Sequence, residues 1–388
     1  MRIDVARAIG EIPRNDWNSL VADGDLPFLE WDWFAALEES GSAAPETGWL
    51  PLHITVREGR KLLAAAPLYL KTHSMGEFVF DHMWAQAAAA LKRPYYPKLV
   101  GVVPATPAAG YRFMHLPGED GEALDRLLFD AAEDICRTNR IAGLHILFAD
   151  PSWAEATARR GYHRWTHHHY LWENPGFAGF GDYIAAFSKN QRKNIRKEAG
   201  RADGQGIGIR IVEGRDAPED YFRRMFELYT ITNDKFVPWD ARFVNEDFFL
   251  RLGRSFRDRL AFVEARRPDG GLIALAMLVR KGGRLWGRYW GAYEEVRDLH
   301  FGACYYAPIS WAISEGIRTF DPGAGSPHKV RRGFRAVEDY SFHKLFDPAL
   351  ERLFADNIDE VNRYEREIID ELNADLPLRG NPPSAGPP

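Results

Sequence analysis

The stretch LAFVEARRPDGGLIALAMLVRKGGRLWGRYWG, residues 260–291, decides the fold class. It contains three apolar runs, Leu260–Arg266, Leu272–Arg280 and Leu285–Trp290, which are separated by glycine-rich turns. Short apolar runs bounded by such turns are typical of strands joined in hairpins. The stretch therefore predicts a three-stranded meander.

Helical patterns lie on both sides of this meander. Glu219–Ile231 and Arg242–Ser255 precede it, and Tyr306–Gly316 follows it with apolar residues along one face. A strand, Ile207–Glu213, is expected before these helices, and a short strand, Arg318–Asp321, after them. Strands interleaved with helices predict an α/β sheet that is covered by helices.

The first half of the chain repeats part of this pattern. LHITVREGRKLLAAAPLYLK, residues 52–71, reads as a strand, a glycine turn and an apolar strand running from Lys61 to Lys71. A loop-rich segment with four prolines follows, from Thr72 to Gly110. The similarity of residues 52–71 to the start of the meander predicts a duplicated unit.

The length of the chain favours two domains, because 388 residues exceed what one hydrophobic core usually organises. We expect one domain over residues 1–178 and another over residues 179–350, with the turn-rich NPGFAGFG at the boundary. A basic connecting helix, residues 183–201, opens the second domain. Residues 351–388 are expected to form a C-terminal helix and a loose tail that ends in NPPSAGPP.

Composition restricts the class of protein. Apolar residues make up 45% and charged residues 27%, as in ordinary globular proteins. The formal charge of −5 argues against DNA binding by whole-surface attraction, although a local basic stripe could contact RNA. Two cysteines are too few for a disulfide framework, and no apolar run approaches the ~20 residues of a membrane-spanning helix. We therefore expect a cytoplasmic protein without an integral membrane segment.

The glycine-rich segment DPGAGSPHKVRRGF, residues 321–334, is the first candidate site. Glycines let a backbone approach a ligand closely, and neighbouring cations suit phosphate or carboxylate groups. Asp321 and His328 are candidate weak bases. The candidate substrate-binding residues are Gly323, Gly325, Lys329 and Arg332. The alternative is a surface turn whose cations are solvated.

The second candidate is GRYWG, residues 287–291. Two glycines within a strand often mark a bulge, which could turn backbone N–H groups toward a ligand carbonyl. Tyr289 is then a candidate catalytic residue, and Gly287, Arg288 and Trp290 are candidate substrate contacts on alternating faces. The alternative is that the glycines only make room for neighbouring tryptophan rings.

A basic stripe on the connecting helix is the third candidate. Its cations follow one another at helical spacing i, i+3, i+4, i+7 and i+8. They are Lys189, Arg192, Lys193, Arg196 and Lys197. The stripe could contact phosphates of RNA or of a nucleotide-linked substrate, or it could be a solvated face.

Two histidine patterns are weaker. Asp81-His82 could form a carboxylate–imidazole pair for acid/base catalysis. His167, His168 and His169 alternate between the faces of a strand, so they are not expected to hold a metal ion together.

Several of these segments resemble known families. The order of strand, two helices, meander, helix and strand is similar to the GNAT acyltransferase fold. Between residues 26 and 346 the chain resembles the FemAB-like family of peptidoglycan biosynthesis/recognition proteins. The segments that carry this resemblance are LPFLEWDWFAALEESGSAAPETGW, APLYLKTHSMGEFVFDHMWA, YYPKL, FSKNQRKNIRKE, GRYWG, LHFGACYY and DPGAGSPHKVRRGF. The resemblance implies two GNAT-like domains in tandem, each a mixed, mostly antiparallel sheet flanked by helices.

The resemblance also implies an activity, namely transfer of an acyl or aminoacyl group from an activated ester or thioester to an amine. Acyl-CoA or aminoacyl-tRNA would be a co-substrate, with no permanently bound cofactor, and a small molecule or peptide such as a peptidoglycan precursor would supply the amine. Lys329 matches the lysine that contacts substrate phosphate in Fem ligases. The [QR]-x-x-G-x-[GA] loop that cradles pyrophosphate in GNAT enzymes is absent, which argues against a conventional coenzyme A site.

Within this hypothesis Lys329, Arg332 and Arg288 anchor anionic groups, and the base is Asp321, His328 or His82. Lys329 is expected to contribute little to folding. Two alternatives remain open on the sequence. The protein could bind a peptidoglycan precursor or another anionic polymer without catalysis, or it could contact RNA without transferase activity.

Overall fold

The computed structural model describes residues 1–235 and 241–379, and the chain divides into two compact units. The sequence predicted a boundary at 178/179, whereas the first unit ends at His167 and takes up two later segments. The terminal NPPSAGPP lies outside the described residues. Unit 1 comprises Met1–His167, Phe243–Phe248 and Asp339–Glu365, and unit 2 comprises His168–Arg242, Phe249–Glu338 and Arg366–Pro388.

Unit 1 contains two groups of paired strands. The first has the order β1 (Arg2–Ala6), β3 (His53–Glu58), β4 (Lys61–Ala66) and β7 (Met114–His115). The second has the order β15 (Arg335–Leu345), β8 (Gly143–Ile146), β6 (Lys98–Gly101), β5 (Leu68–Lys71) and β2 (Trp49–Pro51). In this second group β6 and β8 run parallel, and the other pairs are antiparallel.

The predicted strand Lys61–Lys71 is wrong in one respect. It is broken at Pro67 into β4, which pairs with β3, and β5, which pairs with β6. Proline has no N–H to donate to a strand ladder, so the chain leaves one group of strands there and enters the other.

Five helices lie within the described residues of unit 1, and α12 begins there. They are α1 (Arg14–Asn18), α2 (Trp31–Glu39), α3 (His82–Ala90), α4 (Gly121–Thr138) and α5 (Ala154–Arg159), and α12 spans Pro348–Ala374. Helix α4 begins at a polar N-cap, Asp120, whose side chain accepts a hydrogen bond from the backbone N–H of Ala123. The expected loop-rich segment 72–110 is more ordered than predicted, since it contains α3 and β6.

Unit 2 contains the predicted meander. Strands β11 (Leu260–Arg266), β12 (Leu272–Lys281) and β13 (Arg284–Ala292) pair antiparallel in sequence order. Strand β10 (Gly208–Glu213) pairs with β11, and β14 (Thr319–Asp321) runs parallel to β13. Strand β9 (His163–Glu173) pairs antiparallel with β14 through Trp172 and Glu173. The predicted α/β sheet is therefore confirmed in this unit.

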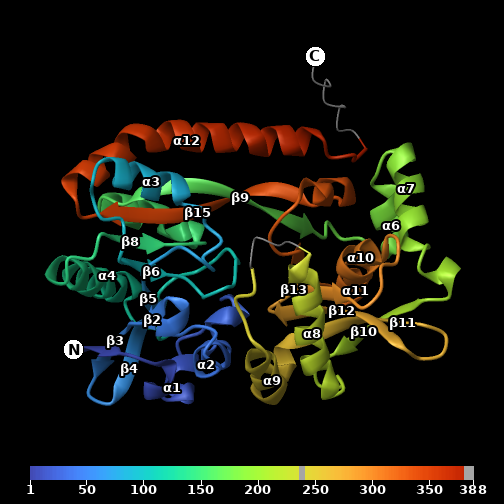
Figure 1. Ribbon diagram of the computed structural model, residues 1–388, viewed down its shortest axis with the longest axis horizontal. Coiled ribbons are helices and arrows are strands. Elements are labelled where there is room, and N and C mark those ends of the chain that lie inside the picture. The colour runs from blue at the N-terminus through green and yellow to red at the C-terminus, as the bar shows by residue number, and fades with distance from the viewer. Residues whose placement is uncertain (236–240, 380–388) are drawn as a thin grey trace. The chain divides into compact units, whose positions relative to one another are not determined.

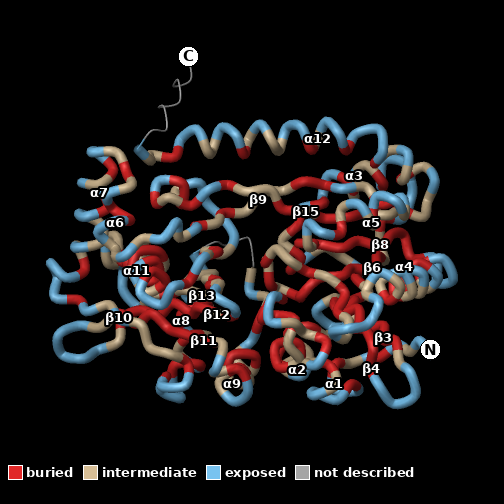
Figure 2. The backbone as a smooth tube through the Cα atoms, turned by 180° about the vertical axis from the view of Figure 1, so that it is seen from behind, coloured by how far each residue is buried: buried red, intermediate tan, exposed pale blue. Residues whose placement is uncertain are grey.

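Side chains alternate between two helical layers. Phe262 of β11 packs against Tyr221 and Phe222 of α8 (Asp220–Asp234), while its neighbours Ala261 and Val263 face the opposite side. Figure 1 shows α8 lying in front of β12 and β13, and α9 (Glu246–Ser255) lies near its end. Figure 2 shows β11 and β12 buried along most of their length, as expected for strands covered on both faces.

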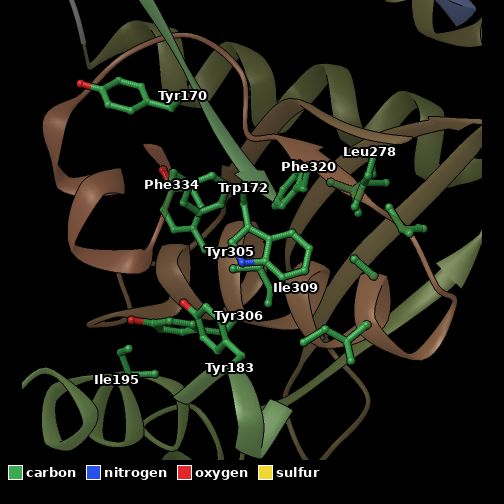
Figure 3. Close-up of a cluster of buried hydrophobic side chains, with 14 of the residues drawn as sticks. Tyr170, Trp172, Tyr183, Ile195, Leu278, Tyr305, Tyr306, Ile309, Phe320 and Phe334 are labelled. Carbon is green, nitrogen blue, oxygen red and sulfur yellow. The ribbon is translucent and has the colours of Figure 1, made fainter. Parts of the chain in front are cut away.

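The second layer is an aromatic core (Figure 3). Helix α10 (Leu299–Phe301), the π-helical turn η7 (Gly302–Tyr306) and α11 (Ala307–Ser314) come after β13 and follow one another without a break. Their side chains pack with those of α6, α7 and the sheet. The labelled members of this cluster include Trp172, Tyr183, Ile195, Leu278, Tyr305, Tyr306, Ile309, Phe320 and Phe334.

The predicted connecting helix 183–201 is two helices, α6 (Phe180–Ala185) and α7 (Lys189–Ala199). Ser188 between them is extended, and its N–H donates to the carbonyl of Pro377. Arg379 in turn donates its N–H to Ala186. The break is therefore made by residues near the C-terminus, which local sequence does not reveal.

No helix within residues 1–235 and 241–379 is long and apolar enough to cross a membrane.

Candidate active site

The strand β13 carries a β-bulge at Arg288. Met277 of β12 lies opposite Tyr289, whereas the next residue, Leu278, lies opposite Gly287. Arg288 is therefore the extra residue of the bulge, and such a residue leaves the regular ladder. The bulge that the GRYWG pattern suggested is confirmed.

The two glycines of GRYWG differ in what surrounds them. A Cβ atom on Gly291 would lie 2.2 Å from the carbonyl oxygen of Leu228 in α8, so this glycine is required for close helix packing. A Cβ atom on Gly287 would lie 3.3 Å from the backbone of Pro322, beside the bulge. The packing interpretation holds for Gly291, and the close backbone approach expected of a site is found at Gly287.

A cavity of about 110 Å³ opens where β13 and β14 separate. The two strands pair only over Arg284–Trp286 and Thr319–Asp321, and the chain then turns into the glycine-rich loop. We call this opening the β13/β14 fork. The cavity is lined by Ala276, Met277, Leu278, Gly287, Arg288, Tyr289, Trp290, His300, Cys304, Tyr305, Pro322, Ala324 and Lys329.

Lys329 belongs to this lining but is not a solvated cation. It lies on the 3-10 turn η8 (Pro327–Arg332), is only 2% exposed, and donates to the carbonyls of Gly323 at 2.6 Å and Ala324 at 2.9 Å. Burial lowers its pKa to about 8, although the Asp321 carboxylate opposes this shift. The expectation that Lys329 contributes little to folding conflicts with these bonds, because it closes the glycine-rich loop.

Asp321 is buried at the same fork, and its carboxylate accepts from the N–H of Gly323 at 2.7 Å. Burial lowers the pKa of Arg288, while Asp321 raises it. Asp321 is thus fixed by a backbone donor and acts electrostatically on two cations, Lys329 and Arg288.

His328 is held by both ring nitrogens. Its Nδ1 lies 2.6 Å from the Ser326 hydroxyl, and its Nε2 lies 3.0 Å from the Tyr305 hydroxyl. Burial and the nearby Arg332 and Lys329 lower its pKa to about 4. His328 therefore orients Tyr305, which does line the cavity, rather than facing the cavity itself.

Arg332 is the clearest correction. It was expected to anchor substrate, but it is 3% exposed and donates to the Glu198 carboxylate at 2.7 Å and to the His328 carbonyl at 2.8 Å. Its guanidinium also lies 3.4 Å from the centre of the Phe301 ring. These contacts give Arg332 a structural role behind the cavity.

Tyr289 and Trp290 point to opposite faces of β13, as predicted. The Tyr289 ring packs edge-on against Tyr229 and Phe249, and the Trp290 ring packs against His300. Burial raises the pKa of Tyr289, so its hydroxyl stays protonated near neutral pH.

His82 does not pair with its neighbour. Asp81 accepts from Lys98 Nζ at 2.5 Å and from the Tyr95 hydroxyl at 2.9 Å, while the exposed His82 begins α3. Both residues belong to unit 1, whereas the cavity belongs to unit 2. Among the described residues, no group of three His, Cys, Asp or Glu side chains is placed to hold a metal ion.

The basic stripe is on the outer face of α7, as expected. Lys189, Lys193, Arg196 and Lys197 are exposed, and Arg192 is half-buried and donates to the carbonyl of Phe187 at 3.0 Å. The inner face of the helix carries the buried Gln191 and Ile195.

Sequence reasoning missed the cavity residues that carry polar or titratable side chains in LHFGACYY, namely His300, Cys304 and Tyr305. All three lie in LHFGACYY, whose only signal was the family resemblance. His300 packs against Trp290 and Tyr305, and burial with nearby cationic groups lowers its pKa to about 4. Burial raises the pKa of the Cys304 thiol, so it stays protonated.

Both units contain mixed sheets, and in unit 2 the bulged strand β13 separates from its parallel neighbour β14 around a small cavity. This architecture agrees with the mixed α/β fold that the sequence predicted. The chain belongs to the FemAB-like family, described as peptidoglycan biosynthesis/recognition, whose pattern matches residues 8–380. No curated protein matches it significantly.

Two solved structures share the fold, and a third is similar at a lower TM-score. FemX is 13% identical with a TM-score of 0.54, and the match covers 91% of this chain and 99% of FemX. A conserved protein of unknown function from Bacteroides thetaiotaomicron is 9% identical with a TM-score of 0.50, over 88% of this chain and 99% of that one. A tandem GNAT protein from clavulanic acid biosynthesis is 13% identical with a TM-score of 0.43, over 89% and 99%. Identities this low show the fold alone.

Proposed function

We propose that the protein transfers an acyl or aminoacyl group to an amine of a peptidoglycan precursor or related acceptor, in the β13/β14 fork. The observation that carries this proposal is the bulge at Arg288 facing a cavity that Lys329 and His300 also line. Backbone N–H groups fixed beside a carbonyl stabilise the oxyanion that forms when a nucleophile attacks it. The family's place in peptidoglycan biosynthesis/recognition supports the choice of acceptor.

The reaction needs one bond made and one broken. The amine nitrogen attacks the donor carbonyl carbon, and the C=O electron pair moves to oxygen beside the bulge. The intermediate then collapses, the carbon–oxygen bond of an ester or the carbon–sulfur bond of a thioester breaks, and the leaving group takes up a proton. Holding the two reactants in register can contribute ~7–11 kcal/mol.

His300 is the best-placed group to receive the amine proton. It lines the cavity, and a pKa of about 4 keeps its ring neutral at physiological pH. Although this makes it a weak base, a protonated amine becomes strongly acidic once it is bonded to the carbonyl carbon. Tyr305, oriented by His328, is the neighbouring hydroxyl that can return a proton to the leaving group.

The segment before α10 favours an ester-linked donor over coenzyme A. A diphosphate would need N–H groups or cations at this helix start. The segment instead carries Glu294, Glu295 and Asp298. Their partners are protein cations, Arg267, Lys235 and Arg201. Together with the basic face of α7, this supports aminoacyl-tRNA as the donor.

The test is to offer charged tRNA and acyl-CoA separately, each with amine acceptors including peptidoglycan precursor peptides, and to follow products by mass spectrometry. We expect a new amide only with charged tRNA. Product from acyl-CoA alone would reverse the choice of donor. Tight precursor binding without product from either donor would instead support a non-catalytic binder.

A further inference from the structure

The inner face of α7 is bonded to the turn η8 that carries Lys329. Gln191 Nε2 donates to the carbonyl of Arg331 at 2.6 Å, and the Glu198 carboxylate accepts from Arg332 at 2.7 Å. These residues lie in the first and last turns of α7, so both ends of the helix hold the same short turn.

The connection is made by buried groups, Arg332 and Tyr306, and by the half-buried Glu198. Arg332 lies against the Phe301 ring, and the hydroxyl of Tyr306 also donates to Glu198. The hydroxyl of Tyr183 on α6 donates to the carbonyl of Arg332 at 2.9 Å. Breaking hydrogen bonds to buried charged groups is costly. We therefore expect that a shift of α7 is passed on to η8.

The outer face of α7 has the chemistry of a phosphodiester contact. Lys189, Lys193, Arg196 and Lys197 are exposed there. Among the described residues, the large apolar side chains that are exposed all lie outside α7. A helix that lies in a lipid interface needs an apolar face to insert, whereas cations alone suffice for a nucleic-acid backbone.

We propose that α7 couples RNA binding to the cavity. The phosphodiester backbone of an RNA held on the outer face fixes the position of the helix, and the Glu198–Arg332 pair transmits this position to the turn that carries Lys329. Glu198 is the positioning residue in this coupling. The effect of this coupling on catalysis rests on the proposed transfer reaction. The coupling between α7 and the turn does not depend on that reaction.

Hydrogen exchange tests the coupling without any turnover. A short synthetic RNA without an acyl group is added to the full chain, and backbone exchange is followed over residues 323–333. We expect slower exchange in this segment, with RNA affinity that falls steeply as salt increases. Lys193→Glu with Lys197→Glu should weaken RNA binding by about tenfold or more. The matched control is Arg126→Glu on α4, an exposed cation that pairs with Glu122 at 3.8 Å and should leave binding unchanged.

Glu198→Gln separates binding from coupling. We expect it to bind the RNA with unchanged affinity but to lose the exchange response at 323–333. In the transfer assay kcat should fall while KM for an RNA-linked donor stays within about twofold. Asp220→Asn, which breaks the exposed pair with Arg224 at 2.6 Å, is the control and should keep the response.

Tyr306→Phe is the second variant, in case Glu198→Gln unfolds, because it removes only the hydroxyl that donates to Glu198. It should weaken the exchange response at unchanged RNA affinity. Three results would overturn the coupling: RNA binding without a response in the unaltered protein, a full response in both Glu198→Gln and Tyr306→Phe, or binding to anionic vesicles in place of RNA. An intact response with no transfer from any donor would count against the proposed reaction only.

Discussion

Both units contain the same order of strand pairs, in which two parallel strands separate at one end. The two units differ in what lies between the separated strands. In unit 1 the sequence of pairs is β5·β6 antiparallel, β6·β8 parallel and β8·β15 antiparallel. In unit 2 it is β12·β13 antiparallel, β13·β14 parallel and β14·β9 antiparallel. The internal duplication that residues 52–71 and 260–281 suggested is thus present in the topology.

In unit 1 the parallel strands are β6 and β8, and Tyr111 fills the space where they separate, the β6/β8 fork. This residue forms a parallel bridge with Ala149, and its hydroxyl donates to the carbonyl of Pro67. A Cβ atom on Gly101, at the end of β6, would lie 2.9 Å from the Tyr111 ring. Where β13 has a bulge and a cavity edged by Lys329, unit 1 has a buried phenol. One large side chain in unit 1 thus occupies the kind of position that is open in unit 2.

The strongest test of this difference is to place a side chain in the β13/β14 fork. Gly287→Val should reduce transfer by about 10²- to 10³-fold, because the new methyl groups crowd Pro322 and displace the bulge that faces the carbonyl. Steady-state kinetics with a melting curve measure the effect. Gly101→Val is the matched control, since its side chain would meet Ile146 and Tyr111 and destabilise unit 1 instead. Equal losses of stability and activity in both variants would contradict the difference between the forks.

Removing the Tyr111 ring from the fork of unit 1 should lower the stability of the protein but not its transfer activity. Tyr111→Ala removes a fully buried ring, and losses of about 3–5 kcal/mol are usual for large-to-small changes of this kind. Chemical denaturation would measure it, with Tyr111→Phe expected to lose only about 0.5–1.5 kcal/mol with the hydroxyl. If transfer per folded molecule fell in Tyr111→Phe, unit 1 would have a part in the chemistry.

Lys329→Ala should lower both the stability of the protein and its transfer activity. The ammonium holds two loop carbonyls, so we expect a loss of about 1–3 kcal/mol in unfolding free energy and at least a tenfold loss in kcat/KM. Denaturant melts and kinetics on the same preparation test this. Unchanged stability would mean that the loop is held by other contacts.

Acid should destabilise unit 2 through its neutral histidines. His300 and His328 have folded pKa values of about 4 against 6.5 for an ordinary histidine, so the unfolded chain binds more protons between these values. Stability should therefore fall as pH decreases from 6.5 to 4, and His300→Gln should flatten this slope. Melting temperatures measured across this range give the result. An unaltered slope in the variant would place His300 in a more solvated site.

The smallest effect is expected at Cys304. It lines the cavity, but burial raises the pKa of its thiol, so it is protonated and unreactive. Cys304→Ala should change turnover by less than about twofold. Replacement of a catalytic nucleophile would reduce turnover far more. Trapping of a thioester on Cys304 by mass spectrometry would contradict this expectation.

Local patterns in the sequence predicted much of unit 2, because the meander depends on neighbouring turns and apolar runs. The bulge near Gly287 and the exposed stripe on α7 followed from spacing in the same way. The burial of Lys329 and Arg332 did not, since it depends on Glu198 and on loop carbonyls that only the folded chain brings near. The break before α7 is made by Pro377 and Arg379, and the filled fork is made by Tyr111 reaching Pro67. Such contacts between distant residues leave no periodic pattern in the sequence.

The two carbonyls on the Lys329 ammonium have a consequence for the proposed reaction. An ammonium has three N–H donors, and the carbonyls of Gly323 and Ala324 take up two of them. The third donor can bind a substrate oxygen while the loop stays closed. A substrate that required a second bond to this nitrogen would have to displace a loop carbonyl, so tighter binding there would be opposed by the loop itself.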